Sequence, residues 1–384
     1  MKNFLKIAIF IFLPFLIGSC SEVDKDPVVS PNGFLLKEPT GGTSYILLPQ
    51  NDADIVTTLE WDQSNNGMPS VSSYEIEIAK SGTNFANPIN AVKVTDPSPT
   101  ATYSWTVAYL NSLLNQIGFA PCESVNIDVR IKSILGLRAE TQFIQYSNVR
   151  TIAVTPYSTN LPLMAFSSDG NITDATPKLA SSGILNSDYE GYMWLTPGTY
   201  KFYQPDACGS YATPTVYGDN GSGNTLAING AGHQVLTAGF FLVKANTATT
   251  GPDALSYTVR PTTWNVFGTA KNFPLANAAM TYDSATKLWK STISLTSGYG
   301  FKFRSNGVGT NLLVLGKYLA TTVGTGDYGG PILSYVPNTT TTATLPSNEL
   351  PVEGARPNPR TYVSYDVTLD LNSPRNYNYT ITLH

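Results

Sequence analysis

Large side chains alternate with small or polar ones in two matching stretches of the chain. Residues 189–203 read YEGYMWLTPGTYKFY, and residues 289–304 read WKSTISLTSGYGFKFR. A period of two predicts strands, and two strands joined by a glycine-containing turn are typical of a β-hairpin. Equivalent residues, such as Leu195 and Leu295, lie 100 positions apart. This spacing indicates two related domains and not a solenoid of short repeats.

The chain before these stretches shows the same period-two pattern in several short runs. The alternating runs are residues 59–61, 74–78, 125–131 and 149–154. Residues 107–114, in contrast, have apolar positions at helical spacing, which predicts a short helix before the strand that starts at Val125. The succession resembles an immunoglobulin or fibronectin-III sandwich. We expect Trp61 and Trp105 to belong to its core.

Further strands are expected in the two later domains. Residues 239–245 and 255–259 would close the first of them, while the second would open on residues 263–268 and close on 365–369 and 378–381. Residues 217–223 are rich in Gly and Asn, which predicts a tight surface loop. The Thr- and Pro-rich segment 338–358 is expected to be a mobile loop.

A chain of 384 residues is long enough for several domains. The pattern predicts an all-β fold of three tandem β-sandwich domains. The first, residues 33–157, is immunoglobulin-like or fibronectin-III-like, and residues 158–259 and 260–384 form two related sandwiches. Trp194, Trp264 and Trp289 lie in alternating strands, where core packing is the expected role.

Residues 1–19 have the features of a lipoprotein signal peptide. Lys2 and Lys6 precede an apolar run that is too short to span a membrane permanently and that ends in small residues. The segment LIGSC, ending at Cys20, has the bacterial lipobox pattern, so we expect Cys20 to be lipidated. Residues 20–32 would then be a polar tether. An ordinary secreted protein with an incidental cysteine is the alternative.

Composition narrows the function classes. Charged residues make up 13% of the chain and the net charge is −4, which argues against a nucleic-acid partner. Only His233 and His384 are available for histidine-based catalysis or a metal site, so we expect no cofactor. Paired carboxylates could still form a glycosidase site. The available acidic residues are Asp188, Glu190, Asp219, Asp283 and Asp327.

Several motifs, taken in order, resemble the SusE and SusF starch-utilisation lipoproteins of Bacteroidetes. These are WNVFG at 264–268, MTYD at 280–283, Leu288-Trp289 and FKFRSN at 301–306, together with YEGY at 189–192 and YGD at 217–219. The resemblance implies carbohydrate-binding-module-like folds for the two later domains. It also implies a non-enzymatic, surface-exposed lipoprotein of the outer membrane that binds starch or another glycan. The implied partners are a TonB-dependent, SusC-like transporter and a SusD-like lipoprotein.

The resemblance implies glycan contacts by aromatic rings and by neighbouring Lys, Arg and Asn side chains. If Phe301 and Phe303 face the core, alternation turns Lys302 and Arg304 outward. The candidate residues are Lys302, Arg304, Asn306, Asn311, Tyr328, Lys201, Tyr203, Tyr217 and Asn220.

The chain departs from the family pattern after FKFRSN. Where the family often has a Trp before an Asn-Tyr-Gly-like turn, residues 307–311 read GVGTN. The later domains therefore bind starch, bind another glycan, or act as a structural spacer of the same complex; a glycoside hydrolase is the remaining alternative.

Overall fold

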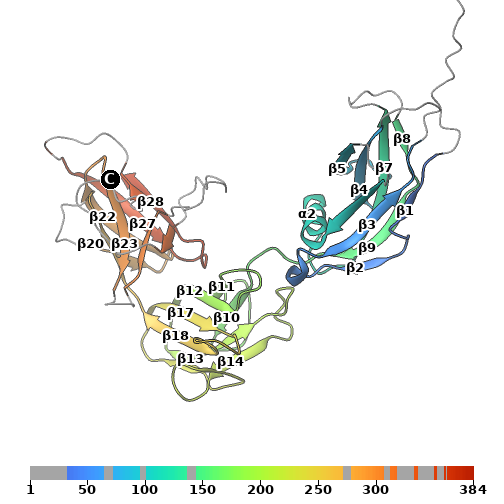
Figure 1. The fold of residues 1–384 in the computed structure, drawn as a ribbon. Helices are drawn as coiled ribbons and strands as arrows, with labels where there is room; N and C mark the ends of the chain where they lie inside the picture. The colour runs from blue at the N-terminus through green and yellow to red at the C-terminus, as the bar shows by residue number, and fades with distance from the viewer. Residues whose placement is uncertain are drawn as a thin grey trace, which may run out of the picture. The chain divides into compact units, whose positions relative to one another are not determined.

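The computed structural model describes residues 33–64, 72–95, 101–135, 144–270, 278–306, 312–317, 333–335, 350–352, 359 and 361–384. The chain divides into two compact units, Met1–Tyr157 and Ser158–His384. Among the described residues, the regular secondary structure of both units is almost entirely β-strand (Figure 1). The all-β prediction is therefore confirmed. The expected signal peptide, Cys20 and tether lie outside the described residues.

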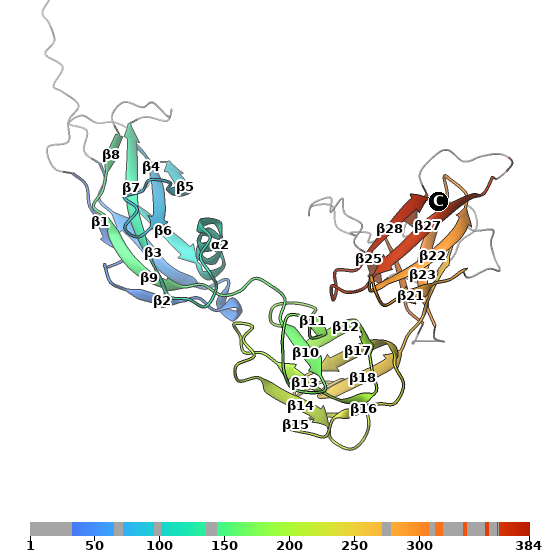
Figure 2. The same cartoon turned by 180° about the vertical axis from the view of Figure 1, so that it is seen from behind.

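The first unit consists of two β-sheets that enclose a core (Figure 2). One sheet has the order β1-β3-β6, with β1 at Leu36–Glu38, β3 at Ile55–Trp61 and β6 at Thr102–Thr106. The other has the order β2-β9-β7-β4-β5, with β2 at Ser44–Ile46, β9 at Arg150–Thr155, β7 at Val125–Leu135, β4 at Ser72–Lys80, β5 at Ile89–Thr95, and β8 at Ile144–Tyr146 paired to β7. Trp61 and Trp105 are buried in this core, as predicted.

The predicted helix is present as α2, Val107–Ile117. The Thr106 side chain caps its first turn by accepting a hydrogen bond from the Tyr109 N–H at 3.2 Å. Gly118 ends it in the left-handed conformation, with φ at 88°, which costs glycine little. The apolar face buries Leu110 and Leu114, which explains the helical spacing in the sequence.

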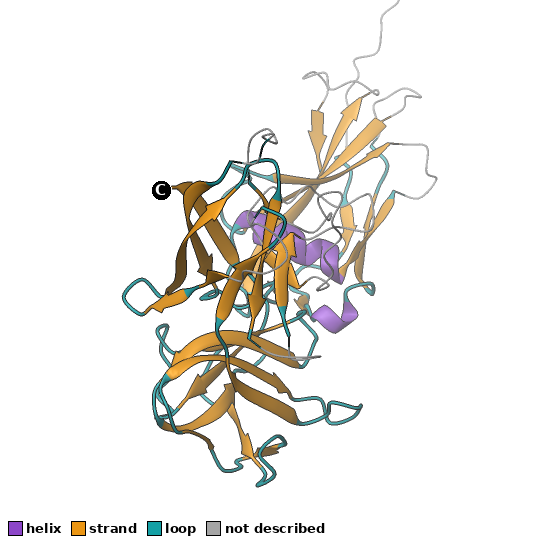
Figure 3. Ribbon diagram, turned by 90° about the vertical axis from the view of Figure 1, so that its left-hand side faces the viewer, coloured by secondary structure: helices purple, strands orange, loops and turns teal. Residues whose placement is uncertain are grey.

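The first part of the second unit, which we call the middle module, is a sheet that runs in the order β15-β14-β13-β10-β11-β12-β17-β18. Its strands are β10 (Leu163–Ser167), β11 (Lys178–Ser181), β12 (Asp188–Leu195), β13 (Gly198–Gln204), β14 (Thr215–Asp219), β15 (Leu226–Ile228), β16 (His233–Val235, paired to β13), β17 (Gly239–Asn246) and β18 (Ser256–Pro261). Loops join its strands, and no helix lies between them (Figure 3).

The second part, the last module, has two sheets. One has the order β20-β19-β23-β24-β25 with β26 paired to β23, and the other has the order β21-β22-β27-β28. The strands are β19 (Trp264–Phe267), β20 (Ala278–Ala279), β21 (Thr281–Asp283), β22 (Leu288–Leu295), β23 (Gly300–Ser305), β24 (Val314–Lys317), β25 (Leu333–Tyr335), β26 (Leu350–Pro351), β27 (Val363–Asp370) and β28 (Asn378–Leu383).

The two matching stretches of sequence have the same pairing pattern, but neither is a hairpin. β12 pairs with β11 and β17, while β13 pairs with β10, β14 and β16. In the last module, β22 likewise pairs with β21 and β27, and β23 with β19, β24 and β26. The glycine-containing turn therefore carries the chain from one set of strands to another. The hairpin prediction is wrong in both modules, and it is wrong in the same way.

The outer face of β12 and β17 packs against the last module. Tyr192, Phe240 and Leu242 belong to the same buried cluster as Trp264 and Trp289. Aromatic rings make much of this contact: the Tyr192 ring lies 5.3 Å from that of Tyr377, and Phe240 lies 4.8 Å from Tyr282. Trp264 and Trp289 are core residues, as expected.

Trp194 differs from the other two expected core tryptophans. Its side chain is 42% exposed, and its ring stacks on Tyr282 of the last module at 5.2 Å with 6° between the planes. The core prediction for Trp194 is therefore wrong, because this ring faces outward from the middle module and covers the edge of the module contact.

Two loop predictions also need correction. Most of 338–358 lies outside the described residues, but Leu350 and Val352 are buried in the core of the last module, so the loop prediction is wrong there. In 217–223, strand β14 continues to Asp219 and buries Tyr217. The loop begins only at Asn220.

Within the described ranges, no helix is both long and apolar enough to cross a lipid bilayer.

We predict that Phe240→Ala destabilises both modules of the second unit, since the ring packs on Tyr282 and Trp289 of the last module. The free energy of unfolding should fall by about 3–5 kcal/mol. Hydrogen exchange should become faster in β22 and β27 as well as in β12 and β17. Phe166→Ala, which empties only the middle module's own core, is the control. Unchanged exchange in β22 and β27 of the Phe240 variant would contradict a shared core.

Candidate functional site

Polar side chains form an ordered array on the outer face of β12, β17 and β18. One row across the three strands is Asp188, Asn246 and Ser256, and the next row is Glu190, Lys244 and Thr258. The residues between them, Tyr189, Ala245 and Tyr257, point into the middle module's core. Because side chains alternate across a strand, burial of the second set places the polar set on the opposite face.

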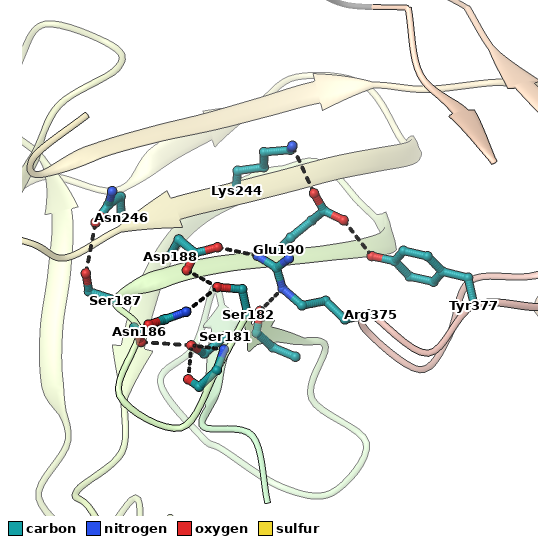
Figure 4. Close-up of polar contacts among 12 residues, drawn as sticks. Ser181, Ser182, Asn186, Ser187, Asp188, Glu190, Lys244, Asn246, Arg375 and Tyr377 are labelled. Atoms are coloured by element: carbon teal, nitrogen blue, oxygen red, sulfur yellow. Dashed lines mark hydrogen bonds and ion pairs between the residues drawn. The ribbon is translucent and has the colours of Figure 1, made fainter. Parts of the chain in front are cut away.

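A cavity of about 460 Å³ lies over this array. The array supplies most of its lining, Asp253 contributes from the segment before β18, and Arg375 reaches in from the connection between β27 and β28. Figure 4 shows Arg375 and Tyr377 pointing toward Asp188 and Glu190. The site therefore contains side chains of both modules.

Glu190 is the most buried charged group of the site, with 2% of its surface exposed. One carboxylate oxygen lies 2.9 Å from Lys244 Nζ, and the other accepts a hydrogen bond from the Tyr377 hydroxyl at 3.0 Å. A buried carboxylate is costly unless it is paired and hydrogen-bonded. Lys244 and Tyr377 meet this requirement from opposite modules.

Asp188 is held in a similar way at the rim. Arg375 Nη2 donates to its carboxylate at 2.6 Å, and the Ser182 hydroxyl donates to the other oxygen. Arg375 also donates from Nε to the Ala180 carbonyl at 2.9 Å. The guanidinium is thereby fixed by two contacts to the middle module.

Burial and the negative charge of Glu190 raise the pKa of Tyr377 well above its usual value. Burial removes water from the phenolate form, and a neighbouring carboxylate disfavours a second negative charge. Tyr377 is therefore a neutral hydrogen-bond donor to Glu190.

Other groups of the cavity remain available to a ligand. Asp253 and Thr258 are exposed, and within the described chain neither side chain forms a hydrogen bond or ion pair. Asn246 uses its carbonyl oxygen to accept from the Ala248 N–H at 2.9 Å. Such a mixture of donors and acceptors suits a ligand with many hydroxyl groups. The described residues contain no cluster of acidic, His and Cys side chains fit for a metal ion.

The residues proposed from FKFRSN do not present a common polar face. Lys302 is fully buried, so the expectation that it points into solvent is wrong; its strand is covered on both faces. Arg304 lies over the Phe267 ring, with 4.6 Å from Cζ to the ring centroid. Asn306 accepts from the Thr263 N–H at 2.8 Å and helps to join β19 to β23.

In the middle module, Lys201 and Tyr203 do face away from the core, as alternation predicted. The loop after β10 comes close to Tyr203, since a Cβ on Gly170 would lie 3.1 Å from the tyrosine hydroxyl. Burial raises the pKa of Tyr203, with a smaller contribution from Asp169. Lys201 is half-buried, and no described residue forms an ion pair or hydrogen bond with its amine.

The remaining candidates are separate from these. Tyr217 is 8% exposed and belongs to the core, so its proposed role as a surface contact is wrong. Asn220 is exposed and accepts from the Ser222 N–H at 3.0 Å, which shapes the loop. Asn311 and Tyr328 lie outside the described residues. The structure does not bring the sequence candidates together into one site.

The polar array on β12, β17 and β18 corresponds to a recognisable pattern in the sequence. Each of the strands β12, β17 and β18 carries two polar residues separated by one core residue. Asp188 and Glu190 are recognisable in the sequence as available carboxylates. Their pairing with Lys244 and Arg375 depends on strand register and on the module contact, which alternation alone does not give.

Part of the chain matches a known protein family. Residues 23–132 match the family model of the SusE outer membrane protein. This segment is SusE-like. The match confirms the resemblance to SusE in this segment. It ends within β7, so none of the residues that line the cavity belongs to the matched segment.

Among solved structures, the crystal structure of SusF from Bacteroides thetaiotaomicron is similar at 10% sequence identity and a TM-score of 0.24. That alignment covers 92% of this chain and 77% of the SusF chain. The search of curated proteins found no match.

We predict that Tyr377→Phe makes the free energy of unfolding fall less steeply with pH above about pH 9. The pKa of Tyr377 is raised in the folded state, so the neutral tyrosine contributes fully to stability below the pKa of an unfolded-state tyrosine, about 10. This contribution is lost as the pH rises above that value. Urea unfolding at several values between pH 9 and 11 should show a wild-type slope steeper by up to about 1.4 kcal/mol per pH unit. Parallel profiles for the two proteins would contradict the raised pKa.

Proposed function

We propose that this protein is a non-catalytic, glycan-binding lipoprotein on the surface of the outer membrane. The observation that carries the proposal is the cavity over the polar array, where Asp253 and Thr258 remain open to a ligand. Sugars offer adjacent hydroxyl groups that both donate and accept hydrogen bonds. The Asp253 carboxylate, the Thr258 hydroxyl and the Asn246 amide, which line the cavity, complement them.

The SusE match supports the cellular setting of this proposal. A family described as an outer membrane protein fits the lipobox at Cys20, and lipidation there would anchor the chain. We accordingly propose starch or another glycan as the ligand, and a SusC-like transporter and a SusD-like lipoprotein as partners.

A structural spacer of the same complex is the second candidate. It is favoured by one observation: the tyrosines that line the cavity, Tyr189 and Tyr257, are buried and do not present a ring face to a sugar. Stacking on ring faces contributes strongly to ligand binding, so binding here depends on hydrogen bonds.

A glycoside hydrolase is disfavoured by how the carboxylates are used. Asp188 and Glu190 lie two residues apart on one face of one strand, and both are held in ion pairs. Hydrolysis needs two carboxyl groups on opposite sides of the scissile bond. We therefore assign these two carboxylates to holding Lys244, Arg375 and Tyr377 in place around the cavity.

Other candidates remain proposals for additional contacts. Lys201 and Arg304 each reach a surface, and Tyr203, Asn220 and Asn306 lie near loop or strand ends. Asn311 and Tyr328 would be tested alongside them.

We predict that Asp253→Asn and Thr258→Ala each weaken glycan binding by roughly three- to tenfold, the effect of losing about one hydrogen bond. Mature protein from Ser21 onward should be run through affinity gels that contain soluble starch, pullulan, dextran or laminarin. Thr215→Ala is the matched control, because Thr215 is an exposed threonine in β14 and does not line the cavity.

Two results would contradict the proposed function. If the wild type is retained by no glycan, the spacer becomes the better account. If chromatography of the incubated glycans shows released oligosaccharides, the protein is an enzyme.

We predict that Cys20→Ser moves the full-length protein from the membrane fraction to the soluble fraction. Labelling with a fatty-acid analogue should mark the wild type and not the variant, because the thiol would be the attachment point. Equal labelling of both proteins would rule out Cys20 as the lipidated residue.

A further inference from the structure

One residue of the last module, Arg375, lines the cavity of the middle module. Arg375 lies in the short connection between β27 and β28, yet both of its hydrogen bonds described above go to the middle module. Its side chain lines the cavity beside Asp188. The contact therefore joins the two modules at the binding site and not at a remote edge.

Arg375 occupies a tight turn of the last module. Its φ is 60°, in the left-handed region that side-chain-bearing residues seldom occupy. The turn is closed by a hydrogen bond from the Asn376 N–H to the Ser373 carbonyl at 3.0 Å. From this turn the guanidinium extends to Asp188 and to the Ala180 carbonyl of the middle module.

Tyr377 makes the second connection, two residues further along. Its side chain is 3% exposed, and its ring packs edge to face on that of Tyr192. Its hydroxyl donates a hydrogen bond to Glu190. Without this hydroxyl, a buried carboxylate loses a hydrogen-bond donor. Glu190 would then reorient toward solvent, and Lys244, its other partner in the array, would move with it.

We infer that the last module is a structural part of the middle module's binding site, with Arg375 and Tyr377 as positioning residues. The two modules then form one composite site for a neutral, polyhydroxylated ligand and do not act as two independent binding modules. The ligand follows from the chemistry of the cavity. The charges of Asp188, Glu190, Lys244 and Arg375 are spent on each other, which leaves hydroxyl-matching groups for the ligand. This inference rests on the proposed glycan binding.

The test uses the complete mature chain with single substitutions, run on affinity gels of soluble starch, pullulan, dextran and laminarin. Tyr377→Phe keeps the ring and removes only the hydroxyl, and it should weaken binding about tenfold. Arg375→Ala should weaken binding at least as much. Arg375→Lys should recover part of the affinity, because it keeps a positive charge near Asp188.

Asn372→Ala is the matched control. Asn372 lies in the same connection, but its side chain donates to the Lys287 carbonyl at 2.9 Å, within the last module. This variant should lower the melting temperature and leave glycan affinity unchanged. A general loss of loop structure would instead lower both.

The outcomes separate this inference from the proposed function. Wild-type affinity in both the Tyr377→Phe and Arg375→Ala proteins, with weaker binding by Thr258→Ala, would overturn the composite site and retain glycan binding. Equal weakening by Asn372→Ala would also overturn it. No retention of the wild type on any gel would overturn both proposals.

Discussion

The burial of one carboxylate, Glu190, constrains the arrangement of residues 158–384. An ionised group with 2% exposure needs partners for its oxygens, and those partners come from β17 and from the last module. In the Lys244–Glu190 ion pair, the lysine side chain is partly exposed to solvent and the carboxylate is buried. Lys244 belongs to the same module as Glu190, but the Tyr377 hydroxyl contributes to offsetting the cost of desolvation only while the two modules remain in contact. The polar cavity and the aromatic contact thus depend on the same geometry.

The shared pairing pattern of the two modules explains why their inner faces are alike and their outer faces differ. Tyr189 and Trp289 occupy equivalent strand positions and both are buried. Outward, the equivalent of Tyr192 is Thr292, and that of Trp194 is Ser294. Core residues are constrained by packing inside each sandwich. The composition of the outer residues depends on what covers them: Tyr192 packs against the last module, whereas its equivalent, Thr292, is exposed.

Alternation in the sequence predicted several of the strands and the inward direction of residues such as Phe301 and Phe303, and helical spacing predicted helix α2. Alternation could not give the hairpin partner, because a turn that leads to an adjacent strand and one that leads to a strand elsewhere in the fold have the same local chemistry. It could not give the site either. Register places Asp188 beside Asn246, and the module contact places Arg375 beside Asp188, over a separation of 187 residues.

The exposure errors at Lys302 and Trp194 have one physical origin. A period of two assigns each side chain to one of two faces, and it says nothing about whether a face meets water. In an isolated sandwich the outer face is solvated, so the side chains that point outward are mostly polar. In this chain Tyr192, Phe240 and Leu242 face outward and are buried, and Lys302 is buried opposite Phe301 and Phe303. Packing against the last module buries Tyr192, Phe240 and Leu242, so an outward-facing side chain suggests ligand binding only when it is also exposed.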